Sequence, residues 1–493
     1  MKKPLTIAAA LLTLCGGAIA YADATSTDGW KPCGDDDLGQ CREISVPLDW
    51  NSPHGAHITL AVTRHLPADG RSPGRTILIT NGSGVSTATA PLRAQSRQTY
   101  FSDDEIAHSQ IVGVELRGGG NTLFGDPAPV RSTQLDCAVN AHDDTVALQP
   151  HSRKEYRDLA AHNRDFVDGC RRGSGDLVEH MDAKTQARDM EAVRQAVGAD
   201  TLSWLAFTNA SLIAEEYAAR YPARLDTVVM DGPADHALSL AERSRREASD
   251  VESSFGRFAR WCADTTSCAL HGNARQITDQ VTGVFADADD HPVKLPDGHT
   301  VDGDQLAFLD QQWLEIGDMP PAESGWTALA ASIAEIRQHQ PAKTFASMYD
   351  SAYGLHPFWD VNRATNCANW DPDIDGFGDL ARRQKAMRAL GPELRGASEA
   401  SETLGGCAGW PVKPNDPPHV SPIHGDATFL VIAGRHDAFA PYTESTRVAR
   451  RTHASLLTYE GDAHIAFFSS RCVRDAIHEQ FDSGRVTEHT CGP

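Results

Sequence analysis

Strand-like and helical segments alternate along the first half of the chain, and this alternation restricts the fold more than any other feature. The strand-like segments are continuous apolar runs rich in β-branched residues, as in fully buried strands, and they cover residues 76–80, 110–115, 202–207 and 225–230. Two earlier segments, 43–48 and 57–64, alternate between apolar and polar residues. Helical stretches at 182–197 and 211–221 separate the later strands. The pattern predicts an α/β fold, a doubly wound and mostly parallel sheet with helices on both faces.

The alternation stops near Asp235 and returns at Thr428. From there, strand, helix, strand and helix follow at 428–433, 442–452, 455–459 and 469–481. The interval is helical and polar, with few sheet-like runs. A length of 493 residues exceeds one standard domain. We therefore expect one sheet domain, 23–235 with 411–493, interrupted by a helical lid at 236–410.

The N-terminus is typical of a secretory signal. Lys2 and Lys3 precede an apolar run at 5–19, and small residues follow through Ala20, Ala22 and Ala24. The apolar run is too short to span a bilayer. We expect a signal peptide at 1–22, cleaved near Ala20 to Ala24, and a secreted protein without a membrane span.

The cysteine count fits an oxidising compartment. Of eleven cysteines, Cys15 lies in the signal, so ten remain for disulfides. Cys15 also raises the alternative of a lipoprotein anchor, which the large Leu14 before it disfavours. Sequence alone leaves the connectivity open, but the close spacings favour the neighbour pairs Cys33–Cys41, Cys137–Cys170, Cys262–Cys268, Cys367–Cys407 and Cys472–Cys491.

Charge and composition limit the partners of this chain. Its 45 basic and 67 acidic residues give a net charge of −22, whereas phosphate contacts need a positive surface. We therefore expect no nucleic acid partner, and a small molecule or short peptide instead. The sequence has no C-x-x-C pair and no histidine cluster at ligand spacing, so we expect no metal and no cofactor. It leaves the oligomeric state open.

Three segments of the sheet domain carry residues that can act together. Thr208 lies where the strand 202–207 turns into a helix, as the hydroxyl of a nucleophile elbow does, and the Asn209 amide would face the oxyanion. Asp437 follows the strand 428–433, and His464 follows the next strand. The order hydroxyl, acid, histidine is that of α/β-hydrolases, in which the acid orients the histidine and the histidine takes the hydroxyl proton.

The chain resembles the secreted tripeptidyl-aminopeptidase-like hydrolases of actinobacteria, a branch of the prolyl-aminopeptidase family of α/β-hydrolases. The matching segments are CREISVPLD at 41–49, GVELRGGG at 113–120, the helix 183–198, YA at 217–218 with YP at 221–222, DG at 231–232, CANW at 367–370, CAGW at 407–410, GRHDAFAP at 434–441 and GDAH at 461–464. The resemblance implies an α/β-hydrolase fold with a helical lid and a TAP-like C-terminal segment. It also implies that Thr208 occupies the nucleophile position, with Asp437 the acid and His464 the base.

The chain departs from this family at the elbow. Thr208 replaces serine, and Ala206 and Ala210 replace glycines. The nucleophile of an elbow sits at positive φ, where a β-branched residue is an outlier, at a cost of about 1 to 3 kcal/mol. The family's glycine-rich oxyanion loop is reduced to 81–84, from which Ser83 would supply the second donor.

These residues predict a secreted hydrolase that cleaves an amide, peptide or ester bond by acyl transfer. The resemblance implies peptides with free N-termini as substrates, and small esters or acylated metabolites stay open. The alternative is a catalytically impaired or non-hydrolytic relative that binds or transforms a ligand in the lidded pocket. Ser211, one helical turn beyond Thr208, is a further candidate for a displaced nucleophile.

Overall fold

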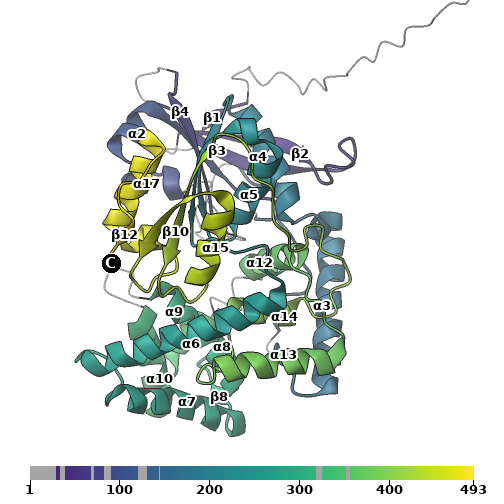
Figure 1. The fold of residues 1–493 in the computed structure, drawn as a ribbon. Helices are drawn as coiled ribbons and strands as arrows, with labels where there is room; N and C mark the ends of the chain where they lie inside the picture. The colour runs from purple at the N-terminus through teal and green to yellow at the C-terminus, as the bar shows by residue number, and fades with distance from the viewer. Residues whose placement is uncertain are drawn as a thin grey trace, which may run out of the picture.

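The fold is built on one ten-stranded sheet (Figure 1). A computed structural model describes residues 29–33, 39–67, 72–82, 90–119, 130–143, 145–317, 325–350 and 356–493. The spatial order is β1-β2-β3-β5-β4-β6-β7-β10-β11-β12. The strands are β1 (Lys31–Pro32), β2 (Gln40–Pro47), β3 (His57–His65), β4 (Arg75–Thr80), β5 (Ser109–Val114), β6 (Leu202–Phe207), β7 (Leu225–Asp231), β10 (Thr428–Gly434), β11 (Ser455–Tyr459) and β12 (Thr490–Cys491).

The sheet is parallel from β5 to β12 and antiparallel from β1 to β5. The strands that were expected from continuous apolar runs lie in its middle, where β5 and β6 are buried along their whole length. Burial on both faces explains why these segments carry apolar residues without alternation. The predicted α/β class is confirmed.

Helices cover both faces of the sheet (Figure 1). One apolar layer joins the sheet to α4 (Ala183–Ala196), α5 (Ala210–Arg220) and α15 (Tyr442–Thr452). The opposite layer joins it to α1 (Ala94–Tyr100), α2 (Asp103–His108) and α17 (Arg471–Ser483). Both layers bring together segments from the two ends of the chain, so the strands after residue 428 complete the sheet that the first half begins.

A helical unit lies beyond one end of the sheet, at the bottom of Figure 1. It has its own apolar core, built mainly from its first six helices. A capping box between Ser239 and Glu242 starts its longest helix. Its helices are α6 (Leu240–Asp264), α7 (Ala274–Asp290), α8 (Gly303–Asp310), α9 (Gln312–Ile316), α10 (Gly325–Arg337), α11 (Lys343–Tyr349), α12 (His356–Asn369), α13 (Gly376–Leu390) and α14 (Glu399–Gly406), with a hairpin of β8 (Val293–Lys294) and β9 (Thr300–Val301).

One long helix was not expected from the sequence. α3 (Arg153–Ser174) contacts α13 and α14 of the helical unit. Its buried residues include Leu159, Phe166, Val167 and Cys170, which recur at helical spacing. The signal was therefore present in the sequence, although many charged residues surround it.

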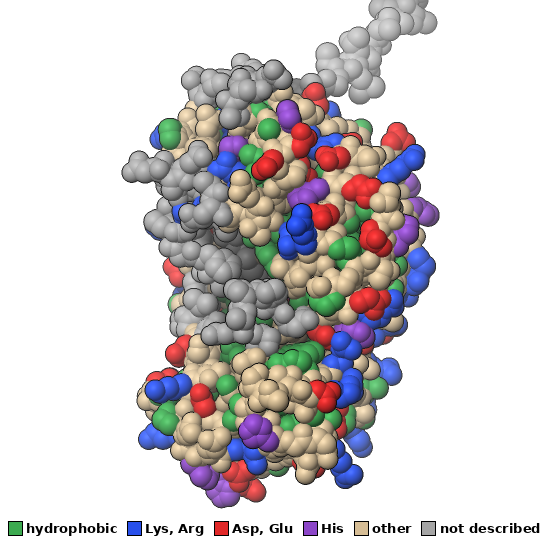
Figure 2. Space-filling model, turned by 90° about the vertical axis from the view of Figure 1, so that its left-hand side faces the viewer, with side chains coloured by type: hydrophobic (Ala, Val, Ile, Leu, Met, Phe, Trp, Pro, Cys, Tyr) green, Lys and Arg blue, Asp and Glu red, His purple; other side chains and the backbone are tan. Residues whose placement is uncertain are grey.

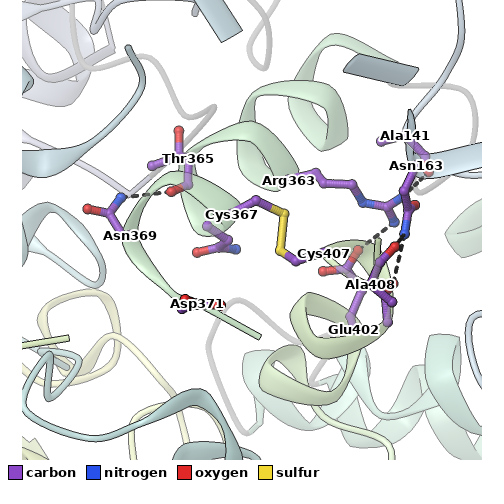
Figure 3. The surroundings of a disulfide bond; sticks show 12 residues. Ala141, Asn163, Arg363, Thr365, Cys367, Asn369, Asp371, Glu402, Cys407 and Ala408 are labelled. Carbon is purple, nitrogen blue, oxygen red and sulfur yellow. Dashed lines mark hydrogen bonds and ion pairs between the residues drawn. A yellow bond between two sulfur atoms is a disulfide. The ribbon is translucent and has the colours of Figure 1, made fainter. Parts of the chain in front are cut away.

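Ten cysteines form five disulfides in the structure. The bonded pairs are Cys33–Cys41, Cys137–Cys170, Cys262–Cys268, Cys367–Cys407 and Cys472–Cys491. Figure 3 shows the Cys367–Cys407 bond, which joins α12 to the end of α14 beside the buried ion pair of Arg363 with Glu402, 2.7 Å apart. These are the neighbour pairs that the spacing favours. Cys15 and the expected signal peptide 1–22 lie outside the described residues.

Charges of both signs are mixed on the face of the molecule that Figure 2 shows. On the part of one face that the structure describes, acidic, basic and histidine side chains are interspersed (Figure 2). Among the helices described, none has the length and apolarity needed to cross a membrane.

Candidate active site

Thr208 lies at the sharp turn between β6 and α5. Its φ of 52° is in the left-handed region, where β-branched residues are rare. Two backbone hydrogen bonds hold the turn, one from the Thr208 N–H to the Asp231 carbonyl at 2.9 Å and one from the Ser211 N–H to the Thr208 carbonyl at 3.0 Å. The turn leaves the Thr208 side chain half-buried beyond the end of the strand, which is the position that a nucleophile elbow gives to its hydroxyl.

Gly82 covers the Thr208 hydroxyl. A Cβ built on Gly82 would collide with Thr208 Oγ1 and would lie 3.6 Å from the Asn209 amide nitrogen. The Asn209 N–H has no backbone partner in the described part of the chain, so it is open toward an oxyanion beside Thr208. Of the expected oxyanion residues, Asn209 is therefore placed next to Thr208, whereas Ser83 lies outside the described residues.

Asp437 is fixed in the loop after β10. Its Oδ1 accepts the backbone N–H groups of Phe439 at 2.8 Å and Ala440 at 2.9 Å. The side chain is buried, with 2% of the residue exposed. Backbone donors stabilise the ionised carboxylate and hold it at one orientation.

His464 is paired with this carboxylate. Its Nδ1 lies 2.9 Å from Asp437 Oδ2 and 3.0 Å from Oδ1, whereas Nε2 has no hydrogen-bond partner among the residues described. Burial alone would lower the pKa of His464, but the charge and hydrogen bonds of Asp437, with the nearby Glu315, raise that pKa to about 9. The pair therefore has the geometry that orients an imidazole and stabilises its charged form.

The elbow and the histidine loop meet at Gly232, the residue after β7. A Cβ there would lie 3.1 Å from His464 Cε1 and 3.3 Å from Nδ1, and Asp231 before it binds the Thr208 amide. No hydrogen bond joins Thr208 Oγ1 to His464 Nε2 in the described structure. Catalytic hydrogen bonds of ligand-free sites are often long and tighten only with substrate.

The helical unit holds the histidine loop. The Glu315 carbonyl accepts the His464 N–H at 3.0 Å, and Arg257 of α6 binds both carboxylate oxygens of Asp462, with Nη2 at 2.8 Å from Oδ2. Gly317 lets the loop approach, because a Cβ there would lie 2.6 Å from the Asp462 carbonyl oxygen. Only Asp462 had a sequence signal, since it falls in the motif of His464.

Three further acids lie close enough to influence the pair of His464 with Asp437. Burial raises the pKa of Glu315 to about 7 and that of Asp250 to about 6. Glu399 also raises the pKa of His464. These acids come from α9, α6 and α14, so acidic groups lie on the side of the candidate site that faces the helical unit. No sequence motif marked them.

The other candidates lie apart from the pair. Ser211 is fully buried on α5, and its hydroxyl has no hydrogen-bond partner in the described structure, so it does not contact His464. A cavity of about 310 Å³ lined by residues of 145–158, α8 and α14 contains none of the expected catalytic residues. A second cavity, of about 10 Å³, borders Asn81, Asn209 and Trp370. The hydroxyl, acid and histidine segments meet at the elbow, which is therefore the candidate active site.

Comparisons with known proteins show which chains this one is similar to. Residues 393–491 match the family described as TAP-like protein. The chain is 26% identical over 458 residues to the serine protease Hip1 of Mycobacterium tuberculosis. The alignment covers 89% of this chain and 84% of Hip1. It is 25% identical over 507 residues to the tripeptidyl aminopeptidase of Streptomyces lividans, with 97% and 89% covered. The solved proline iminopeptidase of Mycobacterium smegmatis aligns with a TM-score of 0.38 at 12% identity, covering 89% of this chain and 97% of that one.

The sheet, the inserted helical unit and the order of hydroxyl, acid and histidine define an α/β-hydrolase. The chain is an α/β-hydrolase enzyme whose C-terminal segment is TAP-like. This confirms the resemblance that the sequence motifs indicate.

Proposed function

We propose that this chain is a secreted hydrolase that cleaves a peptide, amide or ester bond by acyl transfer through Thr208, Asp437 and His464. The observation that carries the proposal is the His464 ring, whose Nδ1 is held 2.9 Å from Asp437 while Nε2 stays open. Hydrolytic function agrees with the relatives, which are named as a serine protease, a carboxylesterase and a tripeptidyl aminopeptidase.

The chemistry follows from these positions. His464 Nε2 takes the Thr208 proton while Oγ1 attacks the substrate carbonyl carbon. The Asn209 amide and the loop that contains Gly82 and Ser83 stabilise the oxyanion. His464 then gives its proton to the leaving amine or alcohol, and water releases the acyl group from Thr208 with His464 again as the base.

The acids around the catalytic pair support a substrate with a free amino terminus. Glu315, Asp250 and Glu399 reach this site from the helical unit. Since burial raises the pKa of the first two toward neutrality, a bound ammonium group would favour their charged forms. We therefore propose an aminopeptidase-like preference, with the segment 236–410 as the lid that confines the substrate.

Export is the remaining part of the proposal. Five disulfides are typical of proteins in oxidising compartments, and the N-terminal sequence has the pattern expected of a signal peptide. The substrate would then be an extracellular or cell-envelope peptide or small molecule.

A non-hydrolytic use of the site is the second candidate. It is favoured by the β-branched Thr208 at positive φ and by its missing hydrogen bond to His464. In that case the pocket would bind or transform a peptide or metabolite without an acyl-enzyme.

Hydrolysis of chromogenic substrates separates the two candidates. We would compare tripeptidyl and aminoacyl p-nitroanilides, with free and acetylated N-termini, and p-nitrophenyl esters. Acyl transfer predicts activity that falls at least about 100-fold in both Thr208→Ala and His464→Ala, while the exposed control His424→Ala is unchanged. An aminopeptidase also loses activity on acetylated peptides. Equal residual rates in all variants would favour the non-hydrolytic candidate.

A further inference from the structure

Two histidines and an aspartate from distant parts of the chain meet beside the connections between the sheet and the helical unit. His236 lies between β7 and α6, on the way out of the sheet. Asp416 and His419 lie between α14 and β10, on the way back. One possible ligand atom from each residue lies within 4.8 Å of the other two.

His236 is oriented with one ring nitrogen free. Its Nε2 lies 2.8 Å from the Asn369 carbonyl oxygen and must donate to it. Nδ1 then carries a lone pair, and it has no hydrogen-bond partner among the residues described. The ring is buried against the edge of Trp370, with centroids 5.2 Å apart. A neutral imidazole nitrogen with an open lone pair can bind a metal ion.

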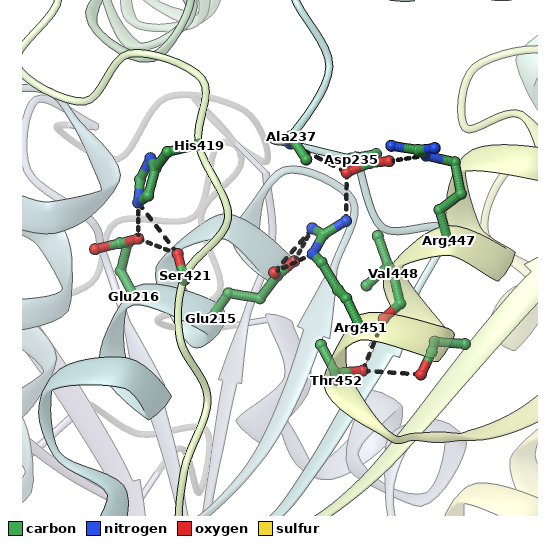
Figure 4. A network of polar contacts seen from close by, with 11 residues as sticks. Glu215, Glu216, Asp235, Ala237, His419, Ser421, Arg447, Val448, Arg451 and Thr452 are labelled. Carbon is green, nitrogen blue, oxygen red and sulfur yellow. Dashed lines mark hydrogen bonds and ion pairs between the residues drawn. The ribbon is translucent and has the colours of Figure 1, made fainter.

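Both ring nitrogens of His419 contact oxygens in this structure, so Nδ1 would have to turn from the Pro417 carbonyl to bind an ion. His419 Nε2 lies 2.9 Å from Glu216 Oε1 (Figure 4), and its Nδ1 lies 3.3 Å from Asp416 Oδ1 and 2.9 Å from the Pro417 carbonyl oxygen. Metal-bound histidines typically donate their second N–H to a carbonyl or carboxylate, which fixes the ring. Both histidines here have that outer partner.

Asp416 supplies negative charge at the centre of the cluster. It is fully buried, and its Oδ2 has no hydrogen-bond partner in the described structure. Lys184 Nζ lies 2.9 Å from Oδ1 and balances its charge. Asp416 Oδ2 is therefore a buried acceptor without a donor in the described structure, which is costly, and His236 Nδ1 is a second acceptor in the same cluster.

We propose that His236, Asp416 and His419 bind a divalent transition metal ion of the Zn²⁺ type. Two imidazole nitrogens and one carboxylate oxygen are a common zinc ligand set, with water at the fourth position. Tetrahedral ligands lie about 3.4 Å apart, so binding would draw the three side chains closer together. The ion would link the segment between β7 and α6 to the segment between α14 and β10. It would thereby fix the helical unit on the sheet. No sequence motif marked this site, because its ligands come from two distant segments.

Titration of the chelator-treated, tag-free full chain with ZnCl₂ tests the site without any measurement of hydrolysis. We expect one equivalent to bind. His236→Ala and His419→Ala should each weaken binding more than about 100-fold, and Glu216→Gln, which removes only an outer charge, by about 10- to 100-fold. His424→Ala, an exposed histidine elsewhere, is the matched control and should bind as the unmodified chain does.

Two measurements keep the test independent of folding. Circular dichroism reports whether each variant is folded, and the partly exposed His419 offers the milder substitution His419→Gln. Co²⁺ should give the strong visible absorption of a tetrahedral site in the unmodified chain and lose it in His419→Gln. Absence of saturable Zn²⁺ binding, or equal affinity in the unmodified chain and in folded His419→Gln, would overturn the proposal.

Discussion

The backbone N–H of His464 donates a hydrogen bond to the carbonyl of Glu315, with N and O 3.0 Å apart. Glu315 belongs to α9 of the helical unit, whereas His464 follows the last central strand. The loop that carries the proposed base is thus held by the helical unit as well as by the sheet. Its alignment therefore depends on where the helical unit sits.

Arg257 tests this dependence. Arg257→Ala removes the bidentate contact with Asp462 and should lower kcat about tenfold, with a smaller change in KM. Arg257→Lys should recover only part of the loss, because an ammonium group cannot reproduce the bidentate geometry. Arg260→Ala, an exposed residue on the same helix, is the control. A kcat unchanged in Arg257→Ala would show that the contact does not position the base.

The pH profile tests the charge environment of His464. Its pKa is raised to about 9, and a general base must be neutral, so kcat/KM should rise with pH up to about 9. Glu315→Gln removes one of the charges that raise this pKa and should move the rise to lower pH, by about one pH unit. The substitution Glu488→Gln at an exposed residue is the control and should leave the pH at which kcat/KM rises unchanged. The same profile in Glu315→Gln and the unmodified chain would contradict this role.

Stability should also depend on the pair of His464 with Asp437. Because the pKa of His464 is raised from 6.5 to about 9 by folding, its contribution to the free energy of unfolding is full below about pH 6.5. The contribution is lost as the pH rises through about 9. Urea unfolding of the unmodified chain and of His464→Gln across this pH range measures the difference in their free energies of unfolding, which should shrink as the pH rises. A difference that grows with pH would contradict the assignment.

Thr208→Ser tests the strain at the elbow. Serine has no branched methyl group, so the change should relieve part of a strain of about 1 to 3 kcal/mol at φ 52°. We expect a higher free energy of unfolding in urea and a several-fold higher kcat. Thr208→Val, which keeps the branch and removes the hydroxyl, is the matched control and should be inactive. Destabilisation by Thr208→Ser would mean that the methyl group is needed for packing.

The Cys367–Cys407 disulfide should stabilise the helical unit. It closes a segment of 40 residues. The reduced entropy of the unfolded chain then predicts a stabilisation of about 3 to 4 kcal/mol. The double variant Cys367→Ala with Cys407→Ala should therefore unfold at lower urea concentration by that free energy. The Cys472–Cys491 pair, which closes only 19 residues, should contribute less. Equal losses in the two double variants would argue against the entropic account.

The sequence predicted the parts of the fold whose signal is local. β6 begins and ends at Leu202 and Phe207 as expected, because a strand buried on both faces needs a continuous apolar run. The pairing of Asp437 with His464 was expected because each follows such a strand. Glu315 and Arg257 were not predicted, because they reach the site only through contacts of the helical unit with the loop that carries His464. His236 and His419 were not predicted, because they come from two distant segments.

Labelling with a fluorophosphonate probe, followed by peptide mass spectrometry, tests the central claim most directly. If Thr208 is a nucleophile activated by His464, the probe should form one adduct on Thr208. That adduct should be absent in His464→Ala and in the folded Thr208→Ala, and present in the exposed control His424→Ala. No adduct on the unmodified chain, or an adduct on Ser211 that persists in Thr208→Ala, would contradict it.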